Sequence, residues 1–152
     1  MKILESGIGE LLQPPDVNAF REWNRHKPKG LIDKRMSEAE AVSRFIHDGD
    51  YIGTELYGTV RCPVSLVNEV VRQGKKNLRL VGQGVYETDL LLAAGLVSAM
   101  DHTYIGLEVY GISSALRREV ESGRVQCVEW SNGSLAWRFK AAAMGVPFIP
   151  VR

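Results

Sequence analysis

The stretch Asp50–Gly74, DYIGTELYGTVRCPVSLVNEVVRQG, predicts a buried strand, a polar turn and a capped helix in direct succession. Pro63 suits a first helical position because its φ is fixed and its missing N–H is not needed there, and Gly74 supplies a left-handed stop. In an open α/β sheet, small molecules bind outside the carboxyl ends of the strands, where the following helix offers free N–H groups. We therefore expect the polar residues of this turn to face a ligand site: Thr54, Glu55, Tyr57, Thr59 and Arg61.

The rest of the chain repeats this order of strand and helix. Ser37 and Glu40 form a capping box that predicts a helix to about residue 46, ahead of the strand at Tyr51. Further strands are predicted at 77–81, 97–105, 125–130 and 147–151, and further helices at 63–73, 87–95, 113–122 and 131–144. Such alternation is typical of right-handed βαβ crossovers. We therefore expect an α/β fold with an open, mostly parallel sheet and helices on both faces.

The two ends of the chain differ from this regular middle. Asp16 is placed to cap a helix over 17–26, and we interpret residues 1–36 as an arm that packs against the main domain or a partner subunit. The alternative for this segment is a partly ordered extension. Residues 37–152 then form the α/β domain. Because no helix follows the predicted strand at 147–151, we expect either another polypeptide or a longer natural chain to complete the sheet.

Composition and charge argue against several classes of protein. A chain of 152 residues suits one domain, or one domain with a short arm. Its 19 basic and 18 acidic residues are interspersed, and the net charge is +1. This charge distribution does not indicate binding to nucleic acid or to a membrane surface. No apolar run approaches the ~20 residues that span a bilayer, and no signal-peptide pattern is present. Cys62 and Cys127 lie far apart and are interpreted as reduced thiols, so we expect a cytoplasmic protein.

The sequence also argues against a metal site and a dinucleotide site. The three histidines lack metal-ligand spacing with one another and with the cysteines, so we expect no metal. Gly82-Gln83-Gly84 begins like a dinucleotide fingerprint, but the third glycine of that motif would stand where the chain has Glu87. We interpret residues 82–84 as a tight turn that lines the crevice at the strand ends, with Gln83 and Gly84 as substrate-binding residues.

Six segments of the chain, in order and nearly without gaps, resemble the A-type chain of the family I CoA-transferases of the glutaconate CoA-transferase type. The resemblance extends to the acyl-CoA hydrolase-like relatives of that family and covers about residues 33–152. The segments are DGDYI, VRCP, NEVVRQGKKNLRLVG, GLVSAMDHTYIGLE, RREVESGRVQCVEWSNGSL and AAAMGVPFIPVR. The resemblance implies an α/β domain with a parallel sheet, in agreement with the pattern of strands and helices.

The resemblance also implies a partner and a substrate. In this family an A-type subunit pairs with a homologous B-type subunit in a hetero-oligomer, and the active site lies between them. The B-type subunit usually supplies a glutamate that attacks the acyl-CoA, forming an anhydride and then a glutamyl-CoA thioester. The implied substrate is a CoA thioester of an organic acid, with no tightly bound cofactor, and the nucleophile is expected on the partner.

Two departures from the family pattern bear on the reaction. The family carries Gly-Gly-Phe in the turn after the first strand, where this chain has Glu55, Leu56 and Tyr57. Replacing two glycines changes the wall that a ligand meets, because glycine lets the backbone approach closely. The family's A-type chain continues well past the AAAMGVPFIPV segment. The loss of the glycine pair, together with the presence of Glu108, slightly favours hydrolysis or C–C bond opening over CoA transfer.

Two carboxylates are the candidate catalytic residues. Glu108 follows the predicted strand at 97–105, and A-like subunits that resemble acyl-CoA hydrolases or ring-cleaving enzymes often have a glutamate there. Glu55 lies in the turn after the first strand, where a carboxylate is placed to act as base or nucleophile. The alternatives are a structural role for Glu108 and, for Glu55, a solvated turn residue or an ion pair with Arg61.

The remaining candidates concern substrate binding. Arg61 has the planar fork that grips a carboxylate, although an ion pair with Glu55 or Asp50 is an equal alternative. Tyr57 lies in the same turn and is a candidate for lining the pocket. The sequence thus predicts an A-type subunit of a heteromeric CoA-transferase-like enzyme. The alternative is a non-catalytic assembly or binding subunit that stabilises a B-type partner.

Overall fold

The computed structural model describes residues 16–54 and 60–151, so the candidates Glu55 and Tyr57 lie outside the described residues. Within them the helices are α1 (Val17–His26), α2 (Glu38–Phe45), α3 (Val64–Arg72), α4 (Tyr86–Ala93), the 3₁₀ turn η1 (Glu108–Tyr110), α5 (Ser114–Glu121) and α6 (Asn132–Met144). The strands are β1 (Tyr51–Gly53), β2 (Leu78–Gly84), β3 (Val97–Ile105) and β4 (Gln126–Glu129). No helix among the described residues has the length and apolar character needed to cross a membrane.

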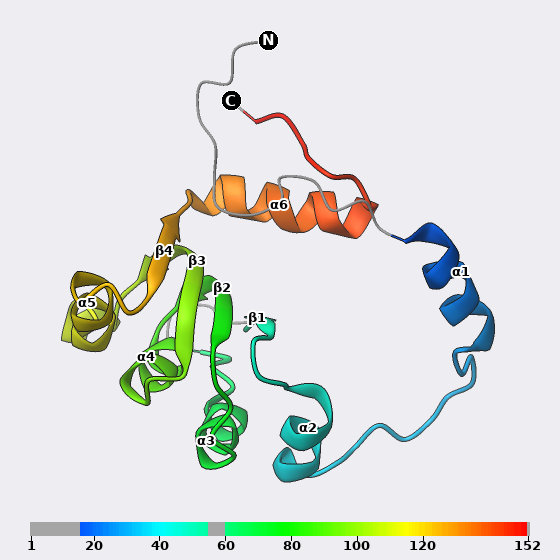
Figure 1. Cartoon of the computed structure of the whole chain (residues 1–152), viewed down its shortest axis with the longest axis horizontal. Helices are drawn as coiled ribbons and strands as arrows, with labels where there is room; N and C mark the ends of the chain where they lie inside the picture. Colours follow the sequence, from blue (N-terminus) through cyan, green and yellow to red (C-terminus); the bar gives the residue numbers. More distant parts are fainter. Residues whose placement is uncertain (1–15, 55–59, 152) are drawn as a thin grey trace. The chain divides into compact units, whose positions relative to one another are not determined.

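Residues 34–135 form one compact unit, and the described residues before 34 join those after 135 in a second. In the first unit the four strands form a sheet in the order β1-β2-β3-β4, and every neighbouring pair is parallel. Figure 1 shows α3, α4 and α5 on one side of this sheet. Right-handed crossovers between adjacent parallel strands require this arrangement. The predicted α/β class with an open parallel sheet is confirmed, but the helices that connect the strands of this unit lie on one face of the sheet and not on both.

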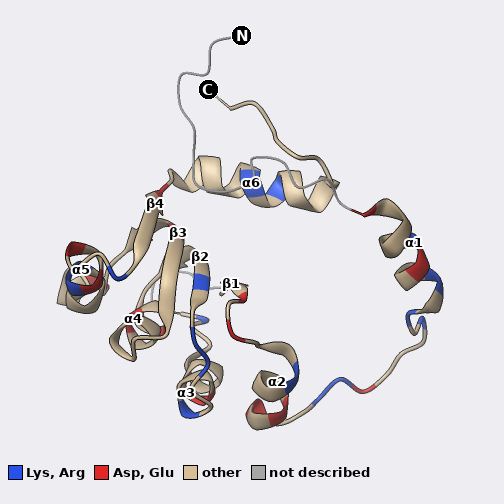
Figure 2. Ribbon diagram, in the orientation of Figure 1, with Lys and Arg blue, Asp and Glu red and all other residues tan. Residues whose placement is uncertain are grey.

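The core lies between the sheet and these helices. Leu78, Leu80 and Met100 alternate with more exposed residues along β2 and β3, as one buried face of a strand requires. Val67 and Val70, one helical turn apart on α3, meet the same core. Charged residues of both signs remain on the outer surfaces of α2 and α5 (Figure 2). The apolar sides of these elements are therefore buried, while charged residues stay exposed.

A polar network crosses the opposite face of the sheet. Ile52 packs against the core, so its neighbour Tyr51 points to the other side. The Tyr51 hydroxyl donates to Asp101 Oδ2 at 2.6 Å, and the Trp130 indole N–H donates to Asp101 Oδ1 at 2.9 Å. The Arg79 guanidinium lies 5.1 Å from the centre of the Tyr51 ring. The network joins all four strands, because Arg79 is on β2, Asp101 is on β3 and Trp130 directly follows β4.

The predicted helix starts are confirmed by their caps. Ser37 Oγ accepts the Glu40 N–H at 3.2 Å, and Asp16 Oδ1 accepts two backbone N–H groups of α1. Within α1, the Phe20 and Trp23 rings lie 5.7 Å apart, and both side chains are more than half exposed. Whether the arm ends at residue 36 stays a prediction.

Four expectations from the sequence were wrong in detail. The first strand, expected to be buried, ends the strand order of the described sheet, and its residues Tyr51 and Gly53 are exposed. Residues 82–84 are not a turn, because Gly82 pairs with His102 and Gly84 with Ile105, which extends β2 by three residues. Residues 147–151 form no strand in the structure as described; the prolines at 147 and 150 cannot donate to a ladder. Pro63 precedes α3 as its cap residue and is not its first helical residue.

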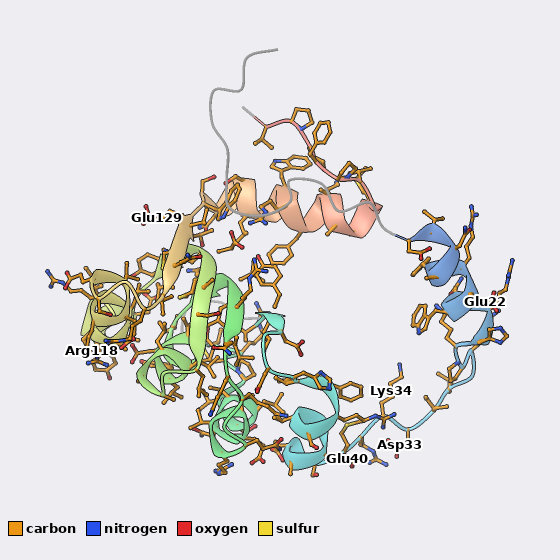
Figure 3. The ribbon with its side chains drawn as sticks, viewed as in Figure 1. Glu22, Asp33, Lys34, Glu40, Arg118 and Glu129 are labelled. Carbon is orange, nitrogen blue, oxygen red and sulfur yellow. The ribbon has the colours of Figure 1, made fainter. Side chains whose placement is uncertain are left out.

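Glu119 anchors the turn between α5 and β4. It is only 8% exposed, and its two carboxylate oxygens accept bonds from Arg124 Nε at 2.7 Å and Arg124 Nη2 at 2.9 Å. Arg118, on the same helix (Figure 3), lies 3.4 Å from Oε1. The hydrogen bonds from Arg124 lower the pKa of Glu119 to about 2. This pair fixes the direction in which the chain enters β4.

The Glu119 carboxylate is expected to stabilise the fold only above acidic pH. Because its pKa in the folded chain lies below the ordinary value of 4.5, its contribution is complete above about pH 4.5. It declines as the pH falls toward 2. We expect Glu119→Gln to have a lower midpoint of urea unfolding than wild type at pH 7. Near pH 2 we expect the two midpoints to lie closer together. Glu121→Gln, which removes an exposed partner of Arg117, is the control and is expected to change little. Equal midpoints for wild type and Glu119→Gln at pH 7 would contradict this expectation.

Candidate functional site

The carboxyl ends of β1, β2, β3 and β4 meet at one edge of the sheet, because all four strands are parallel. Thr54 follows β1, Gln83 and Gly84 end β2, and η1 begins three residues after β3 ends. This edge is where ligands bind in open α/β sheets. The structure therefore brings Gln83, Gly84 and the loop with Glu108 to the expected edge, although they are far apart in sequence.

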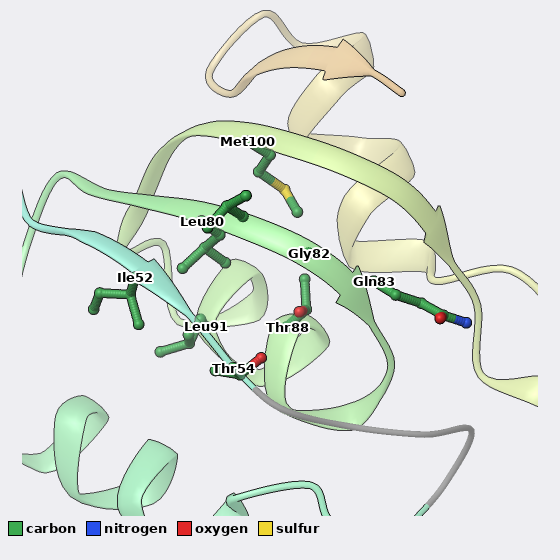
Figure 4. A pocket seen from close by; sticks show the side chains of 9 residues that line it. Ile52, Thr54, Leu80, Gly82, Gln83, Thr88, Leu91 and Met100 are labelled. Atoms are coloured by element: carbon green, nitrogen blue, oxygen red, sulfur yellow. The ribbon is translucent and has the colours of Figure 1, made fainter. Parts of the chain in front are cut away.

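A small pocket lies at this edge between the ends of β1 and β2 and the start of α4 (Figure 4). Its walls are mainly apolar, and its polar side chains are Thr54, Gln83 and Thr88. The full lining is Ile52, Thr54, Leu80, Val81, Gly82, Gln83, Thr88, Leu91 and Met100. We call it the strand-end pocket. Apolar walls with a few polar groups also occur in small-molecule sites, but this cavity is smaller than such sites usually are.

Glycine is needed at positions 82 and 84, near the end of β2, for two different structural reasons. Gly82 has a φ of +137°, which favours glycine. A Cβ at Gly84 would lie 2.3 Å from Thr88 Oγ1 and 2.6 Å from Thr88 Cβ. Thr88 belongs to α4 and is buried, so Gly84 allows α4 to approach the end of β2. The position predicted as a ligand contact is thus required for helix packing.

Glu87 is a buried carboxylate that the sequence did not single out as a site residue. It is 0% exposed, and its Oε1 accepts the Val85 N–H at 3.2 Å and the Thr88 hydroxyl at 3.3 Å. Its Oε2 is buried without a hydrogen-bond partner among the described residues. An acidic residue in the first turn of a helix is normally explained by the helix dipole. The position of Glu87 in the sequence therefore did not predict that its side chain is buried.

The pKa of the Cys62 thiol is raised above its ordinary value. Burial raises the pKa of Cys62, and the Glu87 side chain raises it further, while a hydrogen bond from the Tyr86 N–H opposes both. Cys62 is half-buried and directly precedes Pro63 at the start of α3.

Glu108 is exposed at the tip of the loop after β3. Its backbone is in the left-handed region, with φ of 53°, which is uncommon for a residue other than glycine. The loop is closed beneath it by an antiparallel bridge between Gly106 and Ile112 and by the Leu107 N–H donating to the Gly111 carbonyl at 2.7 Å. The loop therefore presents the Glu108 carboxylate outward from a constrained backbone.

Arg61 also has a left-handed backbone, with φ of 60°, and its side chain is exposed. It lies in the short segment between the undescribed residues 55–59 and the start of α3. Because Glu55 and Tyr57 lie in that undescribed segment, their proximity to Arg61 and Glu108 stays a prediction. The sequence signal for Arg61 was its place after the first strand, and its strained backbone was visible only in the structure.

His102, in the carboxyl half of β3, is a further buried polar residue at this edge. Burial lowers the pKa of its imidazole, while the negative charges of Glu129 and Asp101 act in the opposite direction. Glu129, the last residue of β4 (Figure 3), is its partner in the strand register. No group of three or more His, Cys, Asp or Glu side chains within residues 16–54 and 60–151 is arranged to hold a metal ion.

Comparison with known proteins identifies the family. Residues 35–152 match the family profile described as Coenzyme A transferase. The chain belongs to the coenzyme A transferase family. It is 31% identical over 122 residues to the A-type subunit of glutaconate CoA-transferase from Acidaminococcus fermentans, and the match covers 79% of this chain and 38% of that protein. This finding confirms the resemblance to the A-type subunits of the family.

Two further comparisons show how much of the chain other proteins share. The chain is 46% identical over 156 residues to an uncharacterised protein of Archaeoglobus fulgidus, covering 100% of this chain and 35% of that protein. The crystal structure of the Acidaminococcus fermentans glutaconate CoA-transferase superposes with a TM-score of 0.74 at 30% identity, covering 78% of this chain and 38% of that chain. The chain thus spans well under half the length of these relatives.

Proposed function

We propose that this chain provides the A-type part of a heteromeric enzyme that acts on CoA thioesters of organic acids. The carrying observation is Glu108, an exposed carboxylate on a constrained loop at the carboxyl edge of the sheet, in a member of the CoA transferase family. A residue held in the left-handed region by surrounding structure is characteristic of functional sites. The relative from Acidaminococcus fermentans is named as one subunit of its enzyme, which supports the proposal of a B-type partner.

The surroundings of Glu108 support the proposed partner subunit. Val109 is 90% exposed, Tyr110 is 75% exposed and Ile112 is 78% exposed. Three large apolar side chains in one short loop are costly to leave in water, and such patches mark interaction surfaces. We propose that the B-type subunit covers this loop, so that Glu108 faces a cleft shared by the two polypeptides.

The proposed chemistry assigns a role to each candidate. In hydrolysis, water adds to the thioester carbonyl and gives a proton to Glu108; the C–S bond then breaks and the sulfur of CoA takes a proton. Glu55 is the second proposed carboxylate. Arg61 is proposed to bind a free carboxylate of the substrate, and Tyr57 and Gln83 to line the acyl site.

The proposal also covers the role of Gly84, the cofactor, the place of action and the requirement for CoA transfer. Gly84 contributes by holding α4 close to the strand-end pocket. The reaction uses the CoA thioester as substrate and needs no tightly bound cofactor. The proposed place of action is the cytoplasm, in agreement with the expectation of reduced Cys62 and Cys127. CoA transfer instead of hydrolysis requires the carboxylate nucleophile of the B-type subunit, with an organic acid as acceptor.

The alternative function is a non-catalytic subunit that stabilises a B-type partner. It is favoured by one observation, the replacement of the family's two turn glycines by Glu55 and Leu56. In this case Glu108 has no part in turnover, and the exposed residues 109–112 serve assembly alone.

One experiment separates these functions. The chain is expressed with its B-type partner, and release of free CoA from acyl-CoA is measured with and without an organic acid acceptor. We expect acyl-CoA turnover that depends on this chain. Turnover that requires the acceptor identifies a transferase, and turnover without it identifies a hydrolase. Equal turnover by the B-type partner in isolation would contradict the catalytic proposal and support the assembly role.

A further inference from the structure

The apolar side of helix α1 is exposed in the part of the chain that the structure describes. Val17 is 51% exposed, Phe20 is 61% exposed and Trp23 is 58% exposed, and α1 has no buried residue among those described. A helix of ten residues is only marginally stable in water, and an amphipathic helix gains most of its stability by packing its apolar side. Helix α1 therefore needs a surface to pack against.

The spacing along this side is typical of a helix that pairs with another helix. Asp16, Phe20, Trp23 and Lys27 are separated by four, three and four residues, which is the alternation found along an interhelical contact. We call these four residues the α1 seam. The Phe20 and Trp23 rings lie 5.7 Å apart at its centre. Lys27 Nζ lies 5.0 Å from the centre of the Trp23 ring. The seam thus has two aromatic rings between an acidic end and a basic end.

The charges on the other side of α1 are partly paired within the helix. Glu22 (Figure 3) accepts a hydrogen bond from Arg25 Nη1 at 2.9 Å, and the His26 ring nitrogen lies 2.7 Å from Glu22 Oε1. Helices that bind anionic membranes have a predominantly basic polar side. Glu22 lies within the polar side of α1, and Asp16 begins the seam. These charges favour a protein surface that carries both signs.

An identical helix in the antiparallel direction offers both signs at the required places. It brings Asp16 opposite Lys27 of the second copy and Phe20 opposite Trp23, and two-fold symmetry repeats each contact. In the parallel direction Asp16 would face Asp16, and Lys27 would face Lys27. Antiparallel pairing also places opposite ends of the two helix dipoles together. The seam is therefore complementary to itself only in the antiparallel direction.

We propose that α1 pairs in the antiparallel direction with α1 of a second copy of this chain, through the α1 seam. Two such short helices bury less than the ~1,200 Å² of a standard interface, so the dimer is weak. The inference does not depend on the proposed function, because α1 precedes residues 35–152, which match the family profile. In the proposed enzyme, this pairing joins two heteromers through their A-type chains.

The first test is sedimentation equilibrium of the full chain over about 1–200 µM, the range in which a small interface associates. We expect a monomer–dimer equilibrium for wild type. Trp23→Ala is expected to raise the dissociation constant of the dimer at least about tenfold, because a central aromatic residue contributes much of the binding free energy. Trp137→Ala, which removes a 45% exposed tryptophan of α6, is the control and is expected to leave the constant unchanged. A wild-type chain that stays monomeric, or equal effects of the two alanines, would overturn the proposal.

The second test uses charge variants to determine the direction of pairing. Asp16→Asn keeps a side chain that caps helices as well as Asp does, and Lys27→Gln removes only the positive end of the seam. We expect each to raise the dissociation constant about threefold at low salt, because each removes two exposed ion pairs per dimer. The double variant is expected to weaken the dimer no further than either single variant. Arg25→Gln, on the other side of α1, is expected to change little. Tighter association of Asp16→Asn or Lys27→Gln would indicate parallel helices and would overturn the proposal.

Two other binding partners of α1 are distinguished by further measurements. With vesicles of phosphatidylserine and phosphatidylcholine, we expect no cosedimentation of the chain. Vesicle binding that is lost in Trp23→Ala would assign the apolar side of α1 to a membrane and would overturn the pairing. The same holds if the wild-type chain is monomeric alone and binds the B-type subunit through Trp23. An absence of acyl-CoA turnover would contradict the proposed function and leave the pairing of α1 unaffected.

Discussion

Glu108→Gln is expected to lower kcat of the assembled enzyme by at least about 100-fold, the usual contribution of a positioned acid or base. The amide keeps the size of the side chain and cannot accept a proton from water. Because Glu108 is exposed and lies outside the described core, folding should be unaffected. The measurement is CoA release from acyl-CoA by the complex with the B-type subunit, with co-purification as the check on assembly.

Glu108→Gly removes the carboxylate while keeping a residue that suits the left-handed backbone at this position. Its φ of 53° suits glycine, so this change is expected to leave the unfolding midpoint near that of wild type while it abolishes turnover. Glu121→Gln, another exposed glutamate, is the control for a general change of surface charge. Turnover by Glu108→Gln at the wild-type rate would remove Glu108 from the mechanism and favour the assembly role of this chain.

Gly84→Ala is expected to destabilise the chain by about 1–3 kcal/mol, the range found when a packed core is overfilled. The new Cβ would lie 2.6 Å from Thr88 Cβ, an atom fixed to the backbone of α4, so the helix itself must move. Movement of α4 also shifts Glu87 and the wall of the strand-end pocket, so we expect reduced turnover as well. Urea unfolding followed by circular dichroism measures the first effect.

Gly106→Ala is the matched control for this prediction. A Cβ at Gly106 would lie 2.2 Å from the Tyr104 hydroxyl, which is nominally a closer contact than at Gly84. The obstructing atom is, however, the far end of a half-exposed side chain that can rotate away. We expect a small change in the unfolding midpoint. If both alanine variants were destabilised equally, moving α4 would cost no more free energy than rotating the exposed Tyr104 side chain. This result would contradict the tight packing of α4 on β2.

The pattern of the chain predicted most of the fold because its signals are local. The Ser37 cap and the order of strands and helices each depend on residues close together in the chain. The expectation for residues 82–84 failed because two glycines usually mark a turn, whereas pairing with β3 keeps them in the sheet. That pairing partner lies about twenty residues away, beyond the reach of a local pattern.

The candidate site was predictable only in part for the same reason. The order of strands and helices placed Gln83, Gly84 and Glu108 at one edge of the sheet, since the carboxyl ends of parallel strands coincide. It did not predict that Gly84 serves the packing of Thr88, or that Glu87 is fully buried. The separation of two helices along the chain does not indicate whether their N-terminal ends are in contact.

By itself, the sequence determined the parallel α/β architecture, the resemblance to the CoA transferase family and the edge at which the site lies, because periodicity, capping and motif order are properties of neighbouring residues. Only the tertiary structure decided which of the described polar groups are exposed and which are buried. The burial of Glu87 and the left-handed backbone at Arg61 and Glu108 arise when segments distant in sequence pack together. The chemical behaviour of a charged or hydrogen-bonding group depends on its surroundings. Those surroundings exist only once the chain has folded.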